Sequence, residues 1–222
     1  MTGASPAERL DEVVGRIARS ARLAGRDSGD VALVAVSKTH EAEAIRPLIA
    51  AGQRDFGENR VQEAQSKWPE LKAGTPDVRL HLIGSLQSNK AEEAAALFDV
   101  VHSVDRPSLV EALARAMART GRRPDCFLQV NIGDEPQKGG CAVAELPDLL
   151  ARSLEVGLPI VGLMAIPPAA VEPAPYFALL ARLARRHGLT GLSIGMSADY
   201  ETAVAIGATH VRVGTALFGE RR

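Results

Sequence analysis

The feature of this sequence that most constrains its fold is a repeated alternation of short apolar runs with longer, alanine-rich amphipathic stretches. Several runs are apolar at every position, which is typical of strands in a parallel sheet covered by helices on both faces. The stretches between them, such as EAEAIRPLIAAG and RPSLVEALARAMARTGR, repeat apolar residues at helical spacing. The predicted strands are residues 31–36, 53–56, 79–83, 99–103, 126–131, 159–164, 191–194 and 209–213.

Eight strand–helix units in one chain predict an α/β fold, a single-domain (β/α)8 TIM barrel, with an open doubly wound sheet as the competing arrangement. Polar residues at or just after the first four strands, Lys38, Asn59, His81 and Ser103, recur at near-even steps that fit repeated βα units. The 222 residues suit a barrel, since such barrels run from roughly 200 to more than 400 residues. No Pro/Gly/Ser-rich linker divides the chain, so residues 1–222 are expected to form one domain.

An extra helix is expected ahead of the first strand, in the segment SPAERLDEVVGRIARSARLAG. Ser5 and Glu8 have the spacing of a capping box, and Pro6 suits the first turn of a helix. Apolar residues then recur on one face at helical spacing. The barrel is therefore predicted to carry an additional N-terminal helix.

Charge and cysteine content exclude several classes of partner. A net charge of -1 gives no global field to attract nucleic acid, and no apolar stretch approaches the ~18 residues needed to cross a bilayer. Cys126 and Cys141 are too few for a disulfide framework, and neither they nor the histidines have metal-ligand spacing. With no secretory signal pattern at the start, we expect a cytoplasmic protein with no nucleic-acid partner, no membrane partner and no metal.

The loops after the seventh and eighth predicted strands are candidates for a phosphate site. In a TIM barrel the functional site lies at the C-terminal ends of the strands, and phosphate commonly binds in these two loops. Here they are GMSAD (195–199) and GTALFG (214–219), which combine glycines with the hydroxyls of Ser197 and Thr215. A helix start after Ser197 would also favour an anion. The alternative is a pair of plain tight turns in which Ser197 caps the next helix.

Lys38 ends the first predicted strand, which neighbours the eighth when a barrel closes. Its amine can therefore point into the same mouth as the two loops. An apolar wall lowers the pKa of a lysine from its ordinary value of about 10.4, and a neutral amine can form a Schiff base with an aldehyde or ketone. The alternative is a lysine in an ordinary salt bridge.

Further candidates for the mouth are Asn59, His81, Asn89, Asn131, Met164 and Arg212. His81 lies within its predicted strand and can equally be a core histidine bonded to a backbone carbonyl. Whether Arg212 faces inward depends on strand register, which the sequence does not fix. GMSAD lacks the final glycine of a nucleophile elbow, and the chain has no phosphate-loop or dinucleotide-binding motif.

Six segments of the chain carry a resemblance to a known family: AVSKTH, DFGENRVQEAQSKW, HLIGSLQSNK, VHSVDR, GLMAIPP and LSIGMSADYETAVAIGATHVRVGTALFGER. Together they resemble the pyridoxal-phosphate homeostasis protein family, over nearly the whole chain from about residue 31 to the end. The resemblance implies a fold like the barrel domain of alanine racemase, with the second domain of that enzyme absent. It also implies pyridoxal 5'-phosphate as the cofactor.

Matched position by position, the resemblance implies that Lys38 forms the Schiff base with pyridoxal 5'-phosphate and that Arg212 faces its pyridine nitrogen. The implied phosphate contacts are Met196 (through its backbone), Ser197, Gly214 and Thr215. The implied lining of the ring pocket is Asn59, His81 and Met164. The sequence departs from the family pattern at Tyr200 and Val213, neither of which is an implied cofactor contact.

The resemblance implies a protein of intracellular vitamin B6 homeostasis that holds the cofactor on Lys38 without catalysis of its own. Arginine stays cationic under ordinary conditions, so Arg212 would disfavour protonation of the pyridine nitrogen and weaken the ring as an electron sink. A racemase needs a second acid/base on the opposite face of the substrate. The only two tyrosines, Tyr176 and Tyr200, fall on predicted helices, so neither is expected to supply this second acid/base.

Two enzymatic alternatives remain open at this point. One is a small pyridoxal-phosphate-dependent amino-acid racemase, and the other is a class I aldolase that uses Lys38 on a sugar phosphate. The expected partners are pyridoxal 5'-phosphate itself and, as recipients, pyridoxal-phosphate-dependent apo-enzymes. A monomer is favoured over an oligomer.

Overall fold

The computed structural model describes residues 4–169 and 171–219, and within them eight parallel strands close into a barrel. Each strand pairs with the next along the chain, and β8 pairs with β1 to close the ring. The strands are β1 Ala32–Val36, β2 Asp55–Glu58, β3 Arg79–Leu82, β4 Val100–Val104, β5 Asp125–Gln129, β6 Ile160–Met164, β7 Gly191–Met196 and β8 His210–Val213. The predicted (β/α)8 barrel is confirmed.

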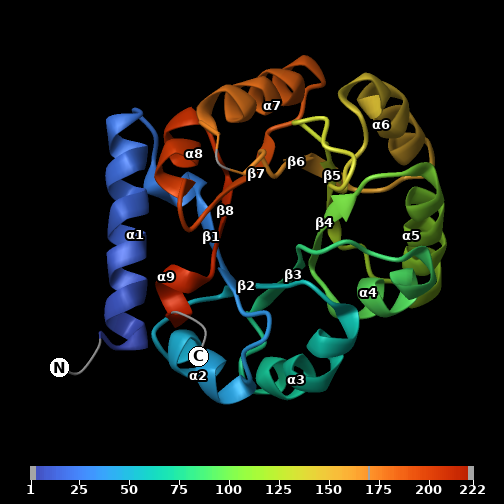
Figure 1. Ribbon diagram of the computed structural model, residues 1–222. Helices are drawn as coiled ribbons and strands as arrows, with labels where there is room; N and C mark the ends of the chain where they lie inside the picture. The colour runs from blue at the N-terminus through green and yellow to red at the C-terminus, as the bar shows by residue number, and fades with distance from the viewer. Residues whose placement is uncertain (1–3, 170, 220–222) are drawn as a thin grey trace.

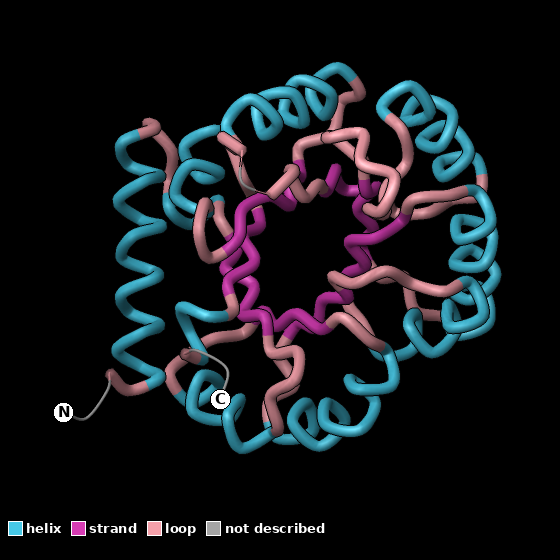
Figure 2. Tube along the Cα trace, viewed as in Figure 1, coloured by secondary structure: helices cyan, strands magenta, loops and turns pink. Residues whose placement is uncertain are grey.

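Helices wrap the outside of the ring of strands (Figures 1 and 2). The α-helices are α1 Pro6–Leu23, α2 Ala42–Ala50, α3 Val61–Gly74, α4 Ala91–Leu97, α5 Pro107–Thr120, α6 Leu146–Glu155, α7 Ala174–Arg186, α8 Tyr200–Ile206 and α9 Thr215–Phe218. Three short 3-10 helices span Ser28–Asp30, Ser88–Lys90 and Val143–Glu145. In Figure 1, α1 lies outside the ring, against α8 and α9.

The extra N-terminal helix α1 is built as its sequence predicts. The Ser5 backbone N–H donates to Glu8 Oε2 at 2.7 Å, and the Glu8 N–H donates to Ser5 Oγ at 3.2 Å, which completes the capping box. Leu10, Val13 and Ile17 are buried on the face turned toward the barrel. The helix therefore covers the seam where β8 meets β1.

The strand β2 begins later than predicted, at Asp55 and not at residue 53. The side chain of Gln53 is buried, and its amide donates to the backbone oxygens of Leu33 (2.5 Å) and Asp55 (2.6 Å), so Gln53 belongs to the turn before the strand. Successive strand residues face opposite sides of a sheet. Asp55 and Gly57 consequently face the barrel interior, whereas Glu58 faces α3.

Two different interiors result. The main apolar core lies between the strands and the surrounding helices and joins residues from almost every element. TIM-barrel interiors are ordinarily filled by branched apolar side chains, and here a small apolar group of Val100, Phe127 and Met164 fills one part. The remainder is polar, with buried His81, His102, Ser193 and Arg212.

Candidate functional site

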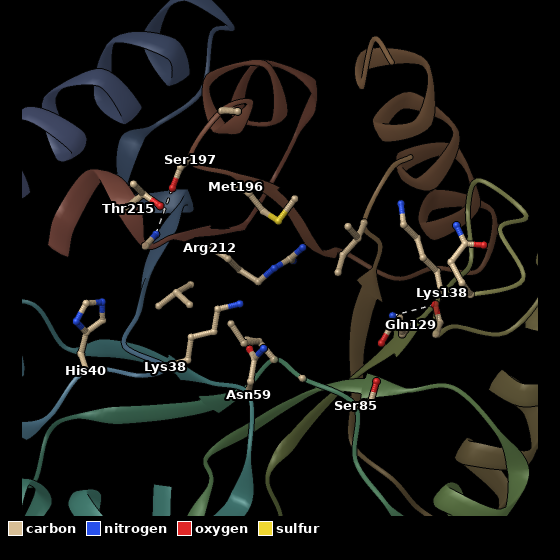
Figure 3. Close-up of a pocket in the computed structure, with 18 of the residues that line it drawn as sticks. Lys38, His40, Asn59, Ser85, Gln129, Lys138, Met196, Ser197, Arg212 and Thr215 are labelled. Atoms are coloured by element: carbon tan, nitrogen blue, oxygen red, sulfur yellow. Dashed lines mark hydrogen bonds between the residues drawn. The ribbon is translucent and has the colours of Figure 1, made fainter. Parts of the chain in front are cut away.

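A pocket of about 630 Å³ opens at the C-terminal ends of the strands, where TIM-barrel sites lie. Lys38 enters it from the loop after β1. Figure 3 shows its side chain extending between Asn59 and Arg212, with Ser197 and Thr215 gathered on one side of the pocket. Residues from the beginning and the end of the chain therefore meet in one cavity.

The loop that carries Lys38 is held from α3. Lys67 on α3 donates to the backbone oxygens of Ser37 (3.0 Å) and His40 (2.8 Å), which flank Lys38. Thr39, the residue after Lys38, has a left-handed backbone with φ 65°, a conformation that costs a non-glycine residue about 1–3 kcal/mol. Its N–H donates to Glu63, which also lies on α3 and pairs with Lys67 at 3.0 Å.

Behind this loop lies a group that we call the ionic cluster: the buried Ser37, Glu58 and Lys67 and the half-buried Glu63. Glu58 is fully buried, and its Oε1 accepts from Ser37 Oγ at 2.6 Å and pairs with Lys67 Nζ at 2.9 Å. Trp68 Nε1 donates to the same oxygen at 3.0 Å. Burial raises the pKa of Glu58, and these donors oppose the shift without cancelling it. The cluster thus ties β2 and α3 to the base of the Lys38 loop.

The loops after β7 and β8 meet across the β1–β8 seam from the Lys38 loop. The Gly214 N–H donates to Ser197 Oγ at 3.3 Å, which links the two loops directly. The alternative in which Ser197 caps the next helix is wrong, because Asp199 occupies the N-cap position of α8 and Asp199 Oδ1 accepts from the Met196 N–H at 2.6 Å. Gly195, with φ 90°, permits this turn, since a Cβ there would lie 2.6 Å from the Cβ of Ala203.

Arg212 forms the floor of the pocket and is 4% exposed. Its guanidinium donates to the backbone oxygens of Ser193 (2.7 Å) and Ala165 (3.1 Å) and to the Ser193 hydroxyl. A guanidinium has five N–H donors, so two remain for a ligand. Burial lowers the pKa of Arg212 to about 10, which leaves it cationic at neutral pH.

The charge of Arg212 is compensated only in part. No ion pair of its guanidinium is found within residues 4–169 and 171–219, and the Asp199 carboxylate raises the pKa of Arg212 from a distance without offsetting the effect of burial. A buried cation without a counter-ion is costly unless a ligand or a hydrogen-bonded environment accepts it. The pocket floor therefore favours a ligand that brings negative charge or a lone pair.

Seven of the nine predicted site residues line this pocket: Lys38, Asn59, Met196, Ser197, Arg212, Gly214 and Thr215. The other two, His81 and Met164, are not among the described residues that line the cavity, so their contact with the cofactor ring stays a prediction. Both lie deeper along the barrel, and the residues two positions further on, Ile83 and Ile166, face the pocket in their place. His81 is instead fully buried and contacts side chains, not a backbone carbonyl.

The side of the pocket opposite the seam contains residues that sequence reasoning missed: Ser85, Gln129, Gln137, Lys138 and Gly139. Gln129 Nε2 donates to the Gly139 backbone oxygen at 3.0 Å, and this bond folds the loop after β5 over the mouth. Lys138 donates to the Pro167 oxygen at 2.8 Å and pairs with Glu135. Ser85 was findable as the polar residue nearest the end of the third predicted strand. Gln129, by contrast, lies inside the predicted strand 126–131, and 137–139 lie in an irregular loop without a pattern.

No helix in the described parts of the chain is long and apolar enough to cross a membrane. Nor do the described residues contain a group of three or more His, Cys, Asp or Glu side chains arranged to hold a metal ion.

The fold and the pocket define the class of protein to which this chain belongs. The family of the alanine racemase N-terminal domain matches residues 10–222. The structure of alanine racemase from Streptomyces lavendulae is similar in fold, with a TM-score of 0.71 and 21% identity over 97% of this chain and 58% of that one. The chain thus has the barrel of the alanine racemase N-terminal domain.

Nearer relatives narrow the class. A pyridoxal phosphate homeostasis protein of Pseudomonas aeruginosa is 45% identical over 221 residues, covering 97% of this chain and 95% of the relative. One from Escherichia coli K12 is 39% identical over 225 residues, covering 97% and 96%. The structure of PipY from Synechococcus elongatus PCC7942 with PLP bound has a TM-score of 0.84 and 43% identity, covering 97% and 100%. The chain belongs to the pyridoxal phosphate homeostasis protein family.

Proposed function

We propose that this protein binds pyridoxal 5'-phosphate and serves vitamin B6 homeostasis by holding the cofactor without catalysing a reaction of its own. The observation that carries the proposal is the convergence of Lys38, Arg212, Ser197 and Thr215 on one pocket at the barrel seam. The name of the relatives and the PLP-bound structure of PipY support the same ligand.

The donor set of the pocket fits this cofactor. When bound, the cofactor supplies an aldehyde with which a lysine amine condenses, forming a C=N bond and releasing water. Lys38 is the amine that we assign to this step. The hydroxyls of Ser197 and Thr215 and the close backbone approach at Gly214 suit a phosphate, while Met196, with its backbone turned by Gly195, borders the same place.

Arg212 and Asn59 complete the assignment. The two guanidinium N–H groups that have no acceptor among the described residues are the ones we assign to the pyridine nitrogen, whose lone pair they can meet. A permanent cation at that atom disfavours its protonation. Asn59 lies beside Lys38 in the pocket, and we assign its amide to the ring or its substituents.

Holding, and not turnover, is the proposed role because the pocket offers poor support for carbanion chemistry. An unprotonated pyridine ring is a weaker electron sink. Proton transfer on the opposite face needs a group within reach, but neither Tyr176 nor Tyr200 is among the described residues lining the cavity. The ammonium of Lys138 is already engaged by Pro167 and Glu135, so it is a hydrogen-bond donor, not a base.

Absorption spectroscopy of the purified protein tests the proposal. We expect a visible band after addition of pyridoxal 5'-phosphate that is lost in Lys38→Ala and also in Lys38→Arg, which keeps the charge but cannot condense in the same way. Borohydride reduction followed by mass spectrometry should find a pyridoxyl group on Lys38. A sugar phosphate on that residue would instead favour a class I aldolase, and turnover of amino acids at enzyme-like rates would favour a racemase.

Four expectations stay predictions: pyridoxal-phosphate-dependent apo-enzymes as recipients, the monomeric state, the single domain over residues 1–222 and the cytoplasmic location. Size-exclusion chromatography with light scattering tests the monomer. The recipient role is tested by comparing how fast an apo-enzyme gains activity from protein-bound cofactor and from the same amount of free cofactor.

A further inference from the structure

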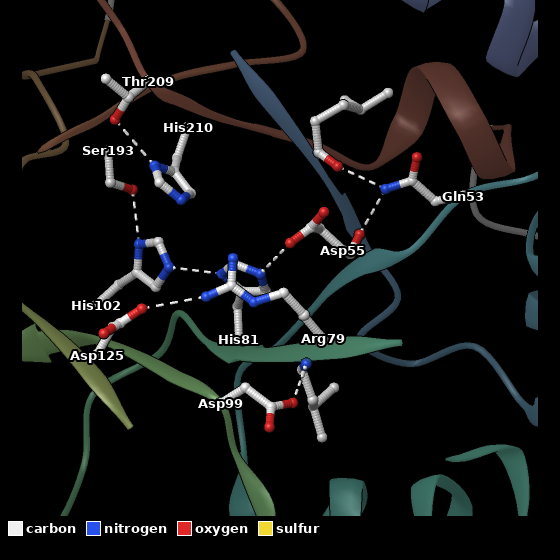
Figure 4. Close-up of polar contacts among 12 residues, drawn as sticks. Gln53, Asp55, Arg79, His81, Asp99, His102, Asp125, Ser193, Thr209 and His210 are labelled. Carbon is white, nitrogen blue, oxygen red and sulfur yellow. Dashed lines mark hydrogen bonds and ion pairs between the residues drawn. The ribbon is translucent and has the colours of Figure 1, made fainter. Parts of the chain in front are cut away.

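The barrel interior beneath the pocket contains four side chains joined end to end, which we call the histidine chain: Asp55, His81, His102 and Ser193 (Figure 4). Asp55 Oδ1 lies 2.8 Å from His81 Nε2, and His81 Nδ1 lies 2.9 Å from His102 Nε2. His102 Nδ1 lies 2.7 Å from Ser193 Oγ. The same hydroxyl accepts a hydrogen bond from Arg212, so the chain ends on the pocket floor.

With neutral rings, one arrangement of protons satisfies every atom of the chain. The Asp55 carboxylate only accepts, so His81 Nε2 carries its hydrogen and His81 Nδ1 accepts. His102 Nε2 must then donate to His81, which leaves His102 Nδ1 as the acceptor for the Ser193 hydroxyl. The lone pairs of that hydroxyl are left facing the guanidinium of Arg212.

A charged His81 would reverse the chain. His102 Nδ1 and Arg212 would then both donate to Ser193, and the described residues offer the hydroxyl hydrogen no other acceptor. The His210 ring packs against both rings of the chain, at 5.9 Å from that of His81 and 5.7 Å from that of His102. Burial lowers the pKa of His102 well below its ordinary range, so this ring is neutral.

We propose that the histidine chain is a positioning device for Arg212, which fixes the Ser193 hydroxyl as an acceptor and so holds the guanidinium in one place on the pocket floor. None of the four residues is among the described residues lining the cavity, so they act through Arg212 and not on a ligand. The inference deepens the proposed function and rests on it in one respect, that pyridoxal 5'-phosphate is the ligand that meets Arg212. The chain would then help to set both the retention of the cofactor and the protonation state of its ring.

The direction of the chain can be tested on the cofactor-free protein, independently of the proposed function. Long-range proton–nitrogen NMR spectra distinguish the two neutral tautomers of histidine from the charged ring. We expect hydrogen on Nε2 and a bare Nδ1 in both His81 and His102 at pH 7. A hydrogen on Nδ1 of His102, or a charged His81, would overturn the proposal.

The effect on Arg212 can be tested with paired variants in cofactor titrations. Ser193→Ala removes the acceptor, and His102→Leu leaves the hydroxyl without its partner, so we expect each to raise the dissociation constant about tenfold and to shift the visible band. His102→Asn places an amide oxygen where Nδ1 accepts, and we expect it to recover most of the affinity. Ser103→Ala, a buried position on the same strand whose hydroxyl has no described partner, is the matched control and should bind as the wild type does.

Urea unfolding confirms that each variant is folded before it is titrated. Wild-type affinity and an unshifted band in folded Ser193→Ala and His102→Leu would overturn the proposal, as would a His102→Asn protein no better than His102→Leu. If the wild type bound no pyridoxal 5'-phosphate, the proposed function would fail, and the tautomers of the cofactor-free protein would still decide whether the chain runs toward Arg212.

Discussion

The two walls of the pocket are supported from behind in opposite ways. Behind Lys38, on the outer face of the sheet, the ionic cluster pairs the buried Lys67 with Glu58 and Glu63. Behind Arg212, inside the barrel, the histidine chain in the proton arrangement proposed above runs through neutral imidazoles to a single carboxylate, that of Asp55, at the far end. One wall is held by charges and the other by oriented neutral groups.

The difference follows from what each wall has to hold. The Lys38 loop presents backbone carbonyl oxygens at Ser37 and His40, and an ammonium with three donors can satisfy both while it pairs with a carboxylate. Arg212 is already a buried cation, and a second cation a few ångströms away would repel it. Neutral donors and acceptors position it without that cost.

Breaking the ionic cluster should have the largest effect. Lys67→Met leaves the buried Glu58 without its cation and the two loop carbonyls without their donor, so we expect the free energy of unfolding to fall by about 3–5 kcal/mol. Urea unfolding with an unchanged m-value measures this loss. The cofactor should also dissociate faster, because the loop that carries Lys38 is no longer tied to α3.

The matched control is Glu70→Gln on the same helix, which breaks the exposed ion pair of Glu70 with Arg46. Exposed pairs contribute about 0–1 kcal/mol, so this variant should unfold close to the wild type. A Lys67→Met protein as stable as Glu70→Gln would show that the ionic cluster is not what holds this wall.

The buried histidines in and beside the histidine chain should make the free energy of unfolding depend on pH. Burial lowers the pKa of His210, which packs against the chain, to about 3, and it lowers that of His102 as well. The unfolded protein takes up protons on these rings below about pH 6.5 while the folded protein does not, so stability decreases as the pH falls. The expected slope is up to about 1.4 kcal/mol per pH unit per histidine, or about 2 kcal/mol each between pH 6.5 and 5.

His210→Gln removes one of these groups, so the difference in unfolding free energy between pH 7 and 5 should shrink by about that amount. Ser103→Ala alters a buried polar residue of the same barrel without removing a titrating group, and its pH dependence should match the wild type. Equal slopes for all three proteins would mean that the His210 ring does not stay neutral in the fold.

Most of the barrel was predictable because each strand and helix is specified by residues that are close together in the sequence. Apolar runs and helical periodicity recur unit by unit, and residues just past strand ends, such as Lys38, Ser197 and Thr215, are carried to the mouth by the architecture itself. The capping box of α1 was likewise predictable, because the residues that form it lie within four positions of one another.

Depth along the barrel was not predictable in the same way. His81 and Met164 were assigned to the pocket, but the stagger of neighbouring strands decides which inward-facing residue reaches the mouth, and that stagger is a property of the closed sheet. The histidine chain shows the same limit, because its contacts join residues 26, 21 and 91 positions apart. No spacing in the sequence marks them as neighbours.

The smallest expected effect concerns the strained residue next to Lys38. Thr39→Gly relieves the left-handed backbone at φ 65° but adds freedom to the unfolded chain, so the two contributions nearly cancel and stability should change by less than about 1 kcal/mol. If the ionic cluster and the strain together fix the direction of Lys38, the more flexible glycine should still raise the dissociation constant for pyridoxal 5'-phosphate by a few-fold.

Asp134→Gly is the matched control, because Asp134 is the other described non-glycine residue with positive φ, at 51°, and does not line the pocket. It should show the same small change in unfolding free energy with no change in cofactor affinity. If Thr39→Gly bound the cofactor as tightly as this control, the bonds from Lys67 and Glu63 would suffice to aim Lys38, and the charged wall would need no help from backbone strain.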